Sequence, residues 1–211
     1  SCRETRFLNR TLLGAPMTRS WFGRSILGLF GWKTRAITHM PRKCIIIAHP
    51  HTSNWDFIIF LLARWGIRVR AHWVGKHTLF RPPFGWLMRL LDGVPVNRSG
   101  GRDSVTAIAE VIQERDDIAI GIAPSGSRSY SEFWRSGFYH IALKAKVPLV
   151  FGFVDYGKKC AGLGDQVLEL TGDMEKDMNQ IRAFYEGMQG RFPEKQNPIL
   201  LKAEAEPQEK E

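Results

Sequence analysis

Residues Ile45–Phe57 read IIIAHPHTSNWDF, and this stretch decides how the rest of the sequence is interpreted. An apolar run that is typical of a buried strand stops at His49, and small polar residues follow it. Ser53 then offers a helix N-cap, and apolar residues at helical spacing continue to Gly66. The stretch therefore predicts a strand, a polar turn and a helix, with Asp56 in the first turn of that helix.

The same alternation of strand-like and helix-like segments continues along the chain. Strands are expected at 44–49, 68–75, 93–98, 117–124 and 147–154, and helices at 54–66, 86–91, 103–115, 136–146 and 173–189. Repeated alternation of this kind predicts an α/β fold, with a mixed, largely parallel sheet flanked by helices. In such sheets, sites gather in the loops that follow the carboxyl ends of the strands.

Length and composition indicate one folded domain with appendages. The chain has 211 residues, and 44% of them are hydrophobic, which suffices for a sizeable core. We expect a basic amphipathic, membrane-associating segment at 1–42, an α/β domain at 43–201 and a charged, solvated tail at 202–211.

Most of the excess positive charge lies at the start of the chain. The segment 1–43 has nine Lys or Arg and one acid, a net charge of +8, whereas the rest has 21 basic and 20 acidic residues. Such an asymmetry favours contact with phosphate, either of nucleic acid or of an anionic membrane. The rest of the chain is nearly neutral and has no recognised nucleic-acid motif, so we expect no nucleic-acid partner.

The segment Trp21–Trp32, WFGRSILGLFGW, adds aromatic and aliphatic side chains to this basic region. The combination is typical of an interfacial segment, whose apolar face lies among acyl chains while its cations meet lipid phosphates. Alternatively, the segment docks as a helix on the core, and the two interpretations are compatible. No apolar run reaches the roughly 18 residues of a transmembrane helix, and no signal peptide is recognised. We therefore expect a peripheral or monotopic protein at the cytoplasmic face of an anionic membrane.

His51 and Asp56 are the first candidate catalytic pair. A histidine is the usual general base near neutral pH, and a carboxylate at its other ring nitrogen fixes the tautomer. However, Ser53-x-x-Asp56 is also a capping-box pattern, which would explain Asp56 without any catalysis. His49 competes for the role of base, but it stands in the strand and is expected to point into the core.

Three further clusters carry cations or small residues after strands. PSGSR, from Pro124 to Arg128, offers backbone N–H groups and an arginine, as a phosphate cradle would. GVPVNR ends at Arg98, and Lys76 follows the strand that ends in WVG. Taken alone, each cluster is better explained as an ordinary turn with a surface cation.

Taken in order, these clusters resemble the 1-acylglycerol-3-phosphate acyltransferase family of glycerolipid acyltransferases. The matching blocks are HTSNWDF, GVPVNR, SGSR and VPLVFGF, which together span about Cys44 to Val154. The resemblance implies an acyltransferase domain at 43–201. It also implies transfer of a fatty acyl group from a thioester, acyl-CoA or acyl carrier protein, to the hydroxyl of a lysophosphatidate-like lipid.

The resemblance also implies a role for each site residue. His51 would be the base that removes the proton of the acceptor hydroxyl, and Asp56 would orient it. Lys76, Arg98 and Arg128 would hold the phosphate of the acceptor. The neighbouring Gly126 and Ser127 would keep the loop tight and supply hydrogen bonds.

This chemistry is consistent with the residues that the chain lacks. Direct attack on a thioester needs no cysteine or serine nucleophile, no metal and no cofactor besides the thioester. The three cysteines, Cys2, Cys44 and Cys160, are far apart and have no metal-ligand spacing, which favours a reducing compartment.

The sequence departs from the family in its third block. Ser125 stands where the family normally has a glutamate, and Ser127 where it has a threonine. The second change keeps the hydroxyl, but the first removes a carboxylate from the acceptor region. His51 and Asp56 are intact, so we still expect an enzyme. The departure leaves two alternatives open: a different hydroxylated lipid as acceptor, or a catalytically weak lipid-binding relative.

Overall fold

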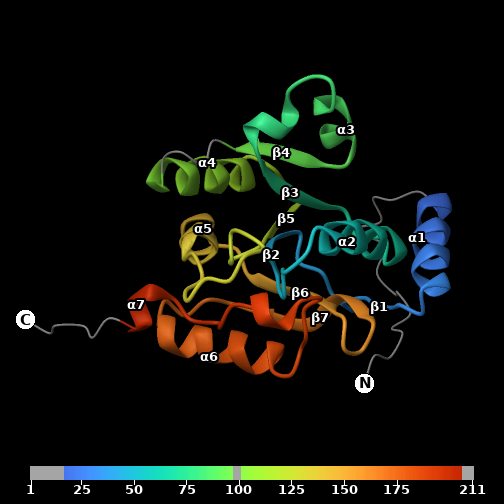
Figure 1. The fold of residues 1–211 in the computed structure, drawn as a ribbon. Helices are drawn as coiled ribbons and strands as arrows, with labels where there is room; N and C mark the ends of the chain where they lie inside the picture. The colour runs from blue at the N-terminus through green and yellow to red at the C-terminus, as the bar shows by residue number, and fades with distance from the viewer. Residues whose placement is uncertain (1–16, 97–100, 206–211) are drawn as a thin grey trace, which may run out of the picture.

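Seven strands form one sheet in the computed structural model, which describes residues 17–96 and 101–205 (Figure 1). The strands are β1 (Lys33–Arg35), β2 (Lys43–Ala48), β3 (Ala71–Lys76), β4 (Gly93–Val96), β5 (Ile118–Ile122), β6 (Leu149–Asp155) and β7 (Cys160–Leu168). The α-helices are α1 (Met17–Leu29), α2 (Trp55–Gly66), α3 (Gly85–Leu90), α4 (Gly101–Gln113), α5 (Gly137–Ala145), α6 (Met174–Tyr185) and α7 (Lys202–Ala205). Two 3₁₀ helices, η1 (His77–Phe80) and η2 (Pro193–Lys195), complete the set.

Five strands of the sheet run in one direction. The order is β1-β7-β6-β2-β5-β3-β4. β2 is parallel to β5 and β6, and β3 is parallel to β4 and β5, whereas β7 runs antiparallel to β6 and takes β1 with it. The predicted mixed, largely parallel α/β sheet is therefore confirmed. Because parallel strands share their carboxyl edge, the loops after β2, β3, β5 and β6 leave the sheet on the same side.

The central strand β2 is buried on both faces, which is why it reads as a continuous apolar run. Ile45 and Ile47 pack into a core with residues of α4, α5 and α6, and Cys44 and Ile46 face a second core on the other side. The packing on both faces of β2 therefore fixes the position from which the following loop starts.

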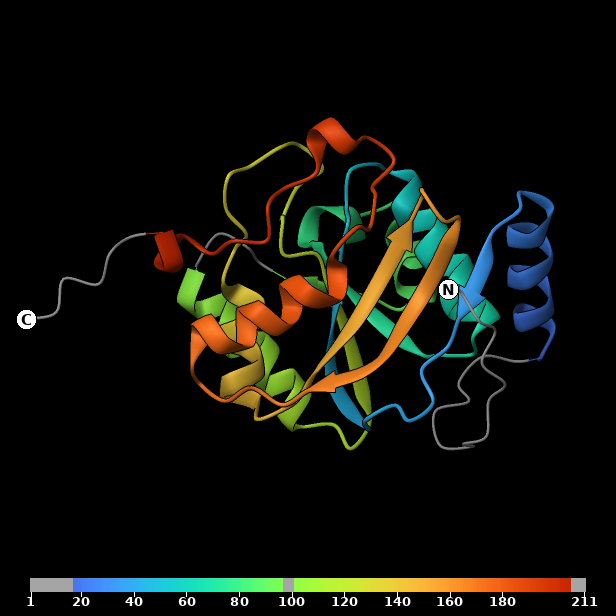
Figure 2. The ribbon, with the colours of Figure 1, turned by 90° about the horizontal axis from the view of Figure 1, so that it is seen from below.

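Helix α1 docks on α2, and Figures 1 and 2 both show the two helices side by side. Leu27 is buried, and the Ser20 hydroxyl donates to the carbonyl of Gly66, at 3.1 Å. The opposite side of the segment leaves four large apolar side chains exposed: Trp21, Phe22, Leu29 and Phe30. Both interpretations of the segment are thus structurally compatible. No helix in the described ranges has the length and apolar character needed to cross a bilayer.

The strands β1 and β7 were not expected from the sequence. β1 lies inside the segment 1–42 yet pairs with β7 in the sheet. β7 begins CAGLG, and glycines lower strand propensity. Gly162 is nevertheless required, because its φ is +151° and a Cβ there would lie 1.9 Å from the carbonyl oxygen of Arg35. Gly162 makes β7 hard to recognise as a strand in the sequence, but the close approach of β1 requires it.

The tail also differs from the expectation at its start. Residues 202–205, predicted as part of a solvated tail, form α7. The Glu204 carboxylate lies 3.0 Å from Nη1 of Arg182 and accepts from the backbone N–H of Leu201. Residues 206–211 lie outside the described part of the chain.

Candidate active site

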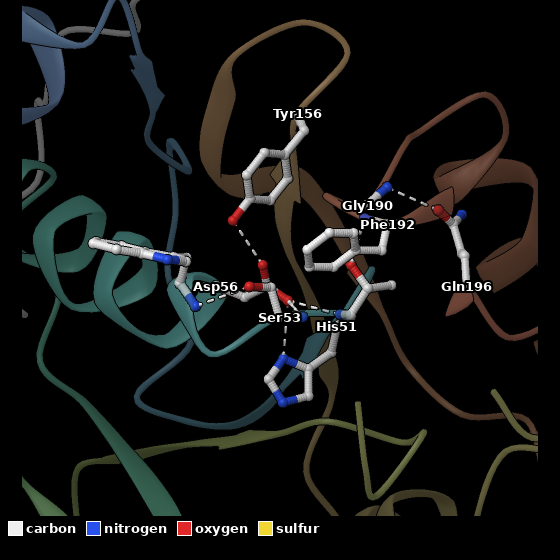
Figure 3. A network of polar contacts seen from close by, with 9 residues as sticks. His51, Ser53, Asp56, Tyr156, Gly190, Phe192 and Gln196 are labelled. Atoms are coloured by element: carbon white, nitrogen blue, oxygen red, sulfur yellow. Dashed lines mark hydrogen bonds and ion pairs between the residues drawn. The ribbon is translucent and has the colours of Figure 1, made fainter. Parts of the chain in front are cut away.

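His51 and Asp56 meet beyond the carboxyl end of β2 (Figure 3). Nδ1 of His51 lies 3.3 Å from Oδ2 of Asp56, at the long end of hydrogen-bond range. The His51 side chain is 23% exposed and that of Asp56 is 5% exposed. A proton on Nδ1 leaves the lone pair on Nε2, so the geometry suits a general base that a carboxylate orients.

Asp56 is also held by the start of its own helix. Its Oδ2 accepts from the backbone N–H groups of Thr52, at 2.7 Å, and Ser53, at 2.8 Å. The Ser53 hydroxyl in turn accepts from the N–H of Trp55, at 3.2 Å. The helix-capping interpretation of Asp56 and the catalytic one are therefore both compatible with the structure, because one carboxylate makes both sets of contacts.

A third group reaches the other oxygen of this carboxylate. The Tyr156 hydroxyl, just beyond β6, donates to Oδ1 of Asp56 at 2.8 Å. Burial alone would raise the pKa of Asp56, but the His51 imidazole, the Ser53 and Thr52 N–H groups and the Tyr156 hydroxyl together lower it. Burial and the neighbouring carboxylate raise the pKa of Tyr156. Asp56 therefore stays ionised and Tyr156 stays protonated near neutral pH.

His49 lies in the core, as expected. It is buried, with its ring 4.9 Å from the Trp134 ring and 5.1 Å from the Tyr185 ring. Burial, with a smaller contribution from His51, lowers the pKa of His49 to about 3. His49 is therefore neutral and enclosed, which removes it as a competitor for the base.

The loop 123–128 follows β5, the strand beside β2. Gly126 has a φ of +67°, and a Cβ there would lie 2.6 Å from Nε of Arg135, so the position accepts only glycine without rearrangement. Ser127 and Arg128 are exposed. Ser125 is buried, and its hydroxyl has no hydrogen-bond partner in the described part of the chain. The loop is thus tight, with one buried polar atom unpaired.

The remaining predicted phosphate ligands cannot be placed. Lys76 ends β3, but its side chain is not among those that the structure describes. Arg98 lies in 97–100, outside the described residues. The roles of Lys76 and Arg98 stay predictions.

The described cysteines offer no nucleophile. Cys44 is a free thiol, and burial, with a smaller contribution from Asp117, raises its pKa to about 12. Cys160 is disulfide-bonded, which the expectation of a reducing compartment did not anticipate. Within 17–96 and 101–205, no three His, Cys, Asp or Glu side chains are grouped so that they could hold a metal ion.

A model of the acyltransferase family matches residues 33–150, more than half of the chain. The chain belongs to the acyltransferase family. The crystal structure of the 1-acyl-sn-glycerophosphate (LPA) acyltransferase PlsC from Thermotoga maritima has a similar fold, with a TM-score of 0.53. The match covers 79% of this chain and 74% of that chain, at 16% sequence identity, and a search of curated proteins found no match.

Two residues of this acyltransferase escaped the sequence analysis. Tyr156 follows the block VPLVFGF, which the analysis did identify, so its place just after β6 was the available signal. Arg191 is exposed, and its guanidinium lies 5.6 Å from the ring centroids of both Trp55 and Phe192. Nothing in the sequence links Arg191 to the site, because only the chain reversal after α6 brings it there.

The segment after α6 also fixes the turn that carries the acyltransferase's His51. The backbone N–H of Phe192 donates to the Thr52 hydroxyl at 3.2 Å, and the carbonyl of Gln189 accepts from the N–H of Tyr156 at 2.9 Å. The turn and Tyr156 are thus tied to one segment. This segment lies beyond all four sequence blocks, so short motifs alone do not define the site.

The buried His49 makes the stability of the acyltransferase depend on pH. Its pKa is about 3 when folded and 6.5 ordinarily, so between these values the unfolded chain binds a proton that the folded chain does not. Above pH 6.5 the residue contributes nothing to the pH dependence. As the pH falls from 6.5 toward 3, the free energy of unfolding should decrease by up to about 1.4 kcal/mol per pH unit.

Urea unfolding across this range, with His49→Phe beside the wild type, tests the expectation. The phenylalanine ring should keep the contacts with Trp134 and Tyr185 and flatten the curve above pH 4, the region where Asp56 adds little. His39→Gln, at an exposed position, is the control and should keep the wild-type slope. A His49→Phe curve as steep as that of the wild type would contradict the assignment.

Proposed function

We propose that the protein is a membrane-peripheral O-acyltransferase that moves a fatty acyl group from an acyl thioester to the hydroxyl of a lysophosphatidate-like glycerolipid. The observation that carries the proposal is the His51–Asp56 pair, with 3.3 Å between Nδ1 and Oδ2, in a partly exposed turn. The family and the fold support acyl transfer to a glycerolipid-like acceptor. The membrane role rests on the apolar, basic exterior of α1.

In the proposed reaction, Nε2 of His51 takes the proton of the acceptor hydroxyl while the hydroxyl oxygen attacks the thioester carbonyl carbon. A carbon–oxygen bond forms, and the carbon–sulfur bond then breaks. The imidazolium returns its proton to the departing thiolate, so the products are the ester and the free thiol. Asp56 supports the imidazolium because its pKa is lowered and it stays ionised throughout.

Thiol release from palmitoyl-CoA by the purified protein, with and without lysophosphatidate, tests this function. Release that depends on the acceptor would support the acyltransferase. Binding of the acceptor without release, from either the CoA or the acyl carrier protein thioester, would instead favour the lipid-binding relative.

Tyr156→Phe should slow acyl transfer up to about tenfold, because it removes one hydrogen bond to the charged Asp56 and keeps the ring. The ring should stay in place through its edge contact with Trp32, at 4.9 Å between centroids. The measurement is kcat with saturating acceptor, compared with Tyr130→Phe at an exposed position as control. An unchanged rate would show that Tyr156 does not position the pair.

A different hydroxylated lipid acceptor is the second candidate, and Ser125 favours it. A buried hydroxyl without a partner is available to the acceptor, where the family's glutamate would place a charge. Ser125→Glu should shift the ratio of kcat/KM between lysophosphatidate and an uncharged monoacylglycerol by about tenfold or more. Ser125→Gln, similar in size but neutral, is the control. If Glu and wild type show the same preference and rate, the idea of a changed acceptor fails.

A further inference from the structure

The segment between β3 and β4 presents an apolar surface to solvent. It contains η1, the turn 81–84 and α3. Figure 1 shows α3 at the end of the seven-stranded sheet where β3 and β4 lie. Four large apolar side chains are at least half exposed there: Leu79 is 50%, Phe84 64%, Trp86 66% and Leu90 54% exposed. We call these four residues the η1–α3 surface. Exposed apolar side chains are normal singly, whereas four on one short segment indicate an interaction site.

The η1–α3 surface rests on a built support. Phe80 is buried below it and stacks on Trp73, with 5.8 Å between ring centroids. The guanidinium of Arg89 lies 5.8 Å from the centroid of the Phe80 ring. The N–H of Gly85 donates to the carbonyl of Arg81 at 2.9 Å, which closes the turn into α3. The four side chains therefore project from a packed base.

The charged residues of the segment that carries this surface have one sign. Between His77 and Leu91 they are Arg81 and Arg89, and there is no Asp or Glu. The next acid, Asp92, is engaged by Arg64 at 2.9 Å and lies 3.7 Å from Arg70. Apolar side chains accompanied by unopposed cations are what an anionic bilayer attracts, because the bilayer offers acyl chains and phosphates together.

The η1 end of this surface lies on the substrate side of the molecule. η1 follows β3 directly, and β3, β5 and β2 are parallel, so η1 leaves the sheet at the edge where His51 and the loop 123–128 lie. A bilayer held at this edge would present a lipid hydroxyl near the pair. Contact through α1 alone would leave the orientation of this edge unspecified.

We propose that the η1–α3 surface is a second membrane contact, independent of α1, which inserts its four apolar side chains into the headgroup boundary of an anionic bilayer. The inference rests on the proposed membrane-peripheral function, and it adds the surface that turns the carboxyl edge of the sheet toward the lipid. Arg81 and Arg89, both exposed, would meet lipid phosphates beside it.

Vesicle partitioning of the full chain tests the proposal without relying on activity. Leu79→Ser/Trp86→Ser should partition at least about tenfold more weakly than the wild type into phosphatidylcholine vesicles that contain phosphatidylglycerol. The matched control is Leu143→Ser/Val167→Ser, two exposed apolar residues on α5 and β7, which should bind as the wild type does. Circular dichroism verifies that each variant is folded. Equal partitioning of the first variant and the wild type would overturn the proposal.

Two further measurements separate the other occupants. Lipids brominated on their acyl chains should quench the tryptophan fluorescence of the wild type more than that of Trp86→Phe. Identical quenching of the two proteins would show that Trp86 does not insert. If the wild type is a dimer and Leu79→Ser/Trp86→Ser a monomer with unchanged vesicle binding, the occupant is a second copy. Turnover on detergent-dispersed acceptor keeps the two proposals apart. A wild type inactive there but bound to vesicles through this surface would refute the reaction, not the contact.

Discussion

Replacing His51 with alanine should lower the rate of acyl transfer about 10²- to 10⁴-fold while the protein stays folded. The loss is large because the proposed reaction has one base and no covalent intermediate to fall back on. Folding should survive because the His51 side chain is 23% exposed, whereas that of His49 is buried against Trp134 and Tyr185. Thiol release with saturating acceptor, together with urea unfolding of the same samples, measures both effects.

Asp56→Asn separates the two roles of the carboxylate. An amide cannot carry the charge that supports the imidazolium, and its oxygen alone would have to serve the N–H groups of Thr52 and Ser53 and the Tyr156 hydroxyl. We therefore expect this variant to lose both rate and stability, whereas His51→Ala loses rate alone. His140→Ala, at an exposed position on α5, is the control for each measurement. A folded His51→Ala protein that retains more than about a tenth of the wild-type rate would exclude His51 as the base.

The largest expected loss of stability follows from Arg64→Met. Arg64 is 3% exposed, and its guanidinium donates to the Asp92 carboxylate at 2.9 Å and to the carbonyls of Ala71 and Leu91. Removing one partner of a buried ion pair typically costs about 3–5 kcal/mol. Because the Asp92 side chain is 22% exposed and water can reach it, we expect the lower end, about 3 kcal/mol.

Arg70 provides a matched control for this prediction. It lies 3.7 Å from the same Asp92 carboxylate, but its side chain is 61% exposed, so Arg70→Met should cost about 0–1 kcal/mol. Adding Asp92→Asn to Arg64→Met should restore part of the loss, because the unpaired carboxylate disappears. Urea unfolding of the four proteins gives the free energies. Equal costs for Arg64→Met and Arg70→Met would show that burial of the pair does not matter.

Most of the fold could be predicted from the sequence because its central strands are buried on both faces. Residues 44–48 and 149–154 read as apolar runs for that reason, and the expected strands there agree with β2 and β6 to within two residues. The strands β1 and β7 escaped because β1 has three residues and β7 carries glycines that its neighbours require. Short or glycine-rich strands are defined by their partners, which a local pattern does not contain.

The site was predictable where its residues follow strands, and not where distant segments return to it. His51 and Asp56 lie five residues apart around a predicted strand-to-helix turn, so the sequence could place them near each other, whereas their roles were implied only by the blocks that follow them. Tyr156 and Phe192 reach the same turn from 100 and 140 residues away in the hydrogen bonds that they make. The sequence could not decide whether Asp56 caps the helix or orients His51. In the structure, one carboxylate contacts both the N–H groups at the start of the helix and the His51 ring.

Helix α1 has consequences for anyone who wishes to produce this protein without detergent. Its inner side supplies Leu27 to the core and the Ser20 contact with Gly66, at the end of the same helix that carries Asp56 near its start. Deleting the helix to improve solubility would strip the support from α2. A more soluble form would keep α1 and replace only its exposed apolar side chains, with hydrophilic substitutions at Trp21, Phe22 and Leu29.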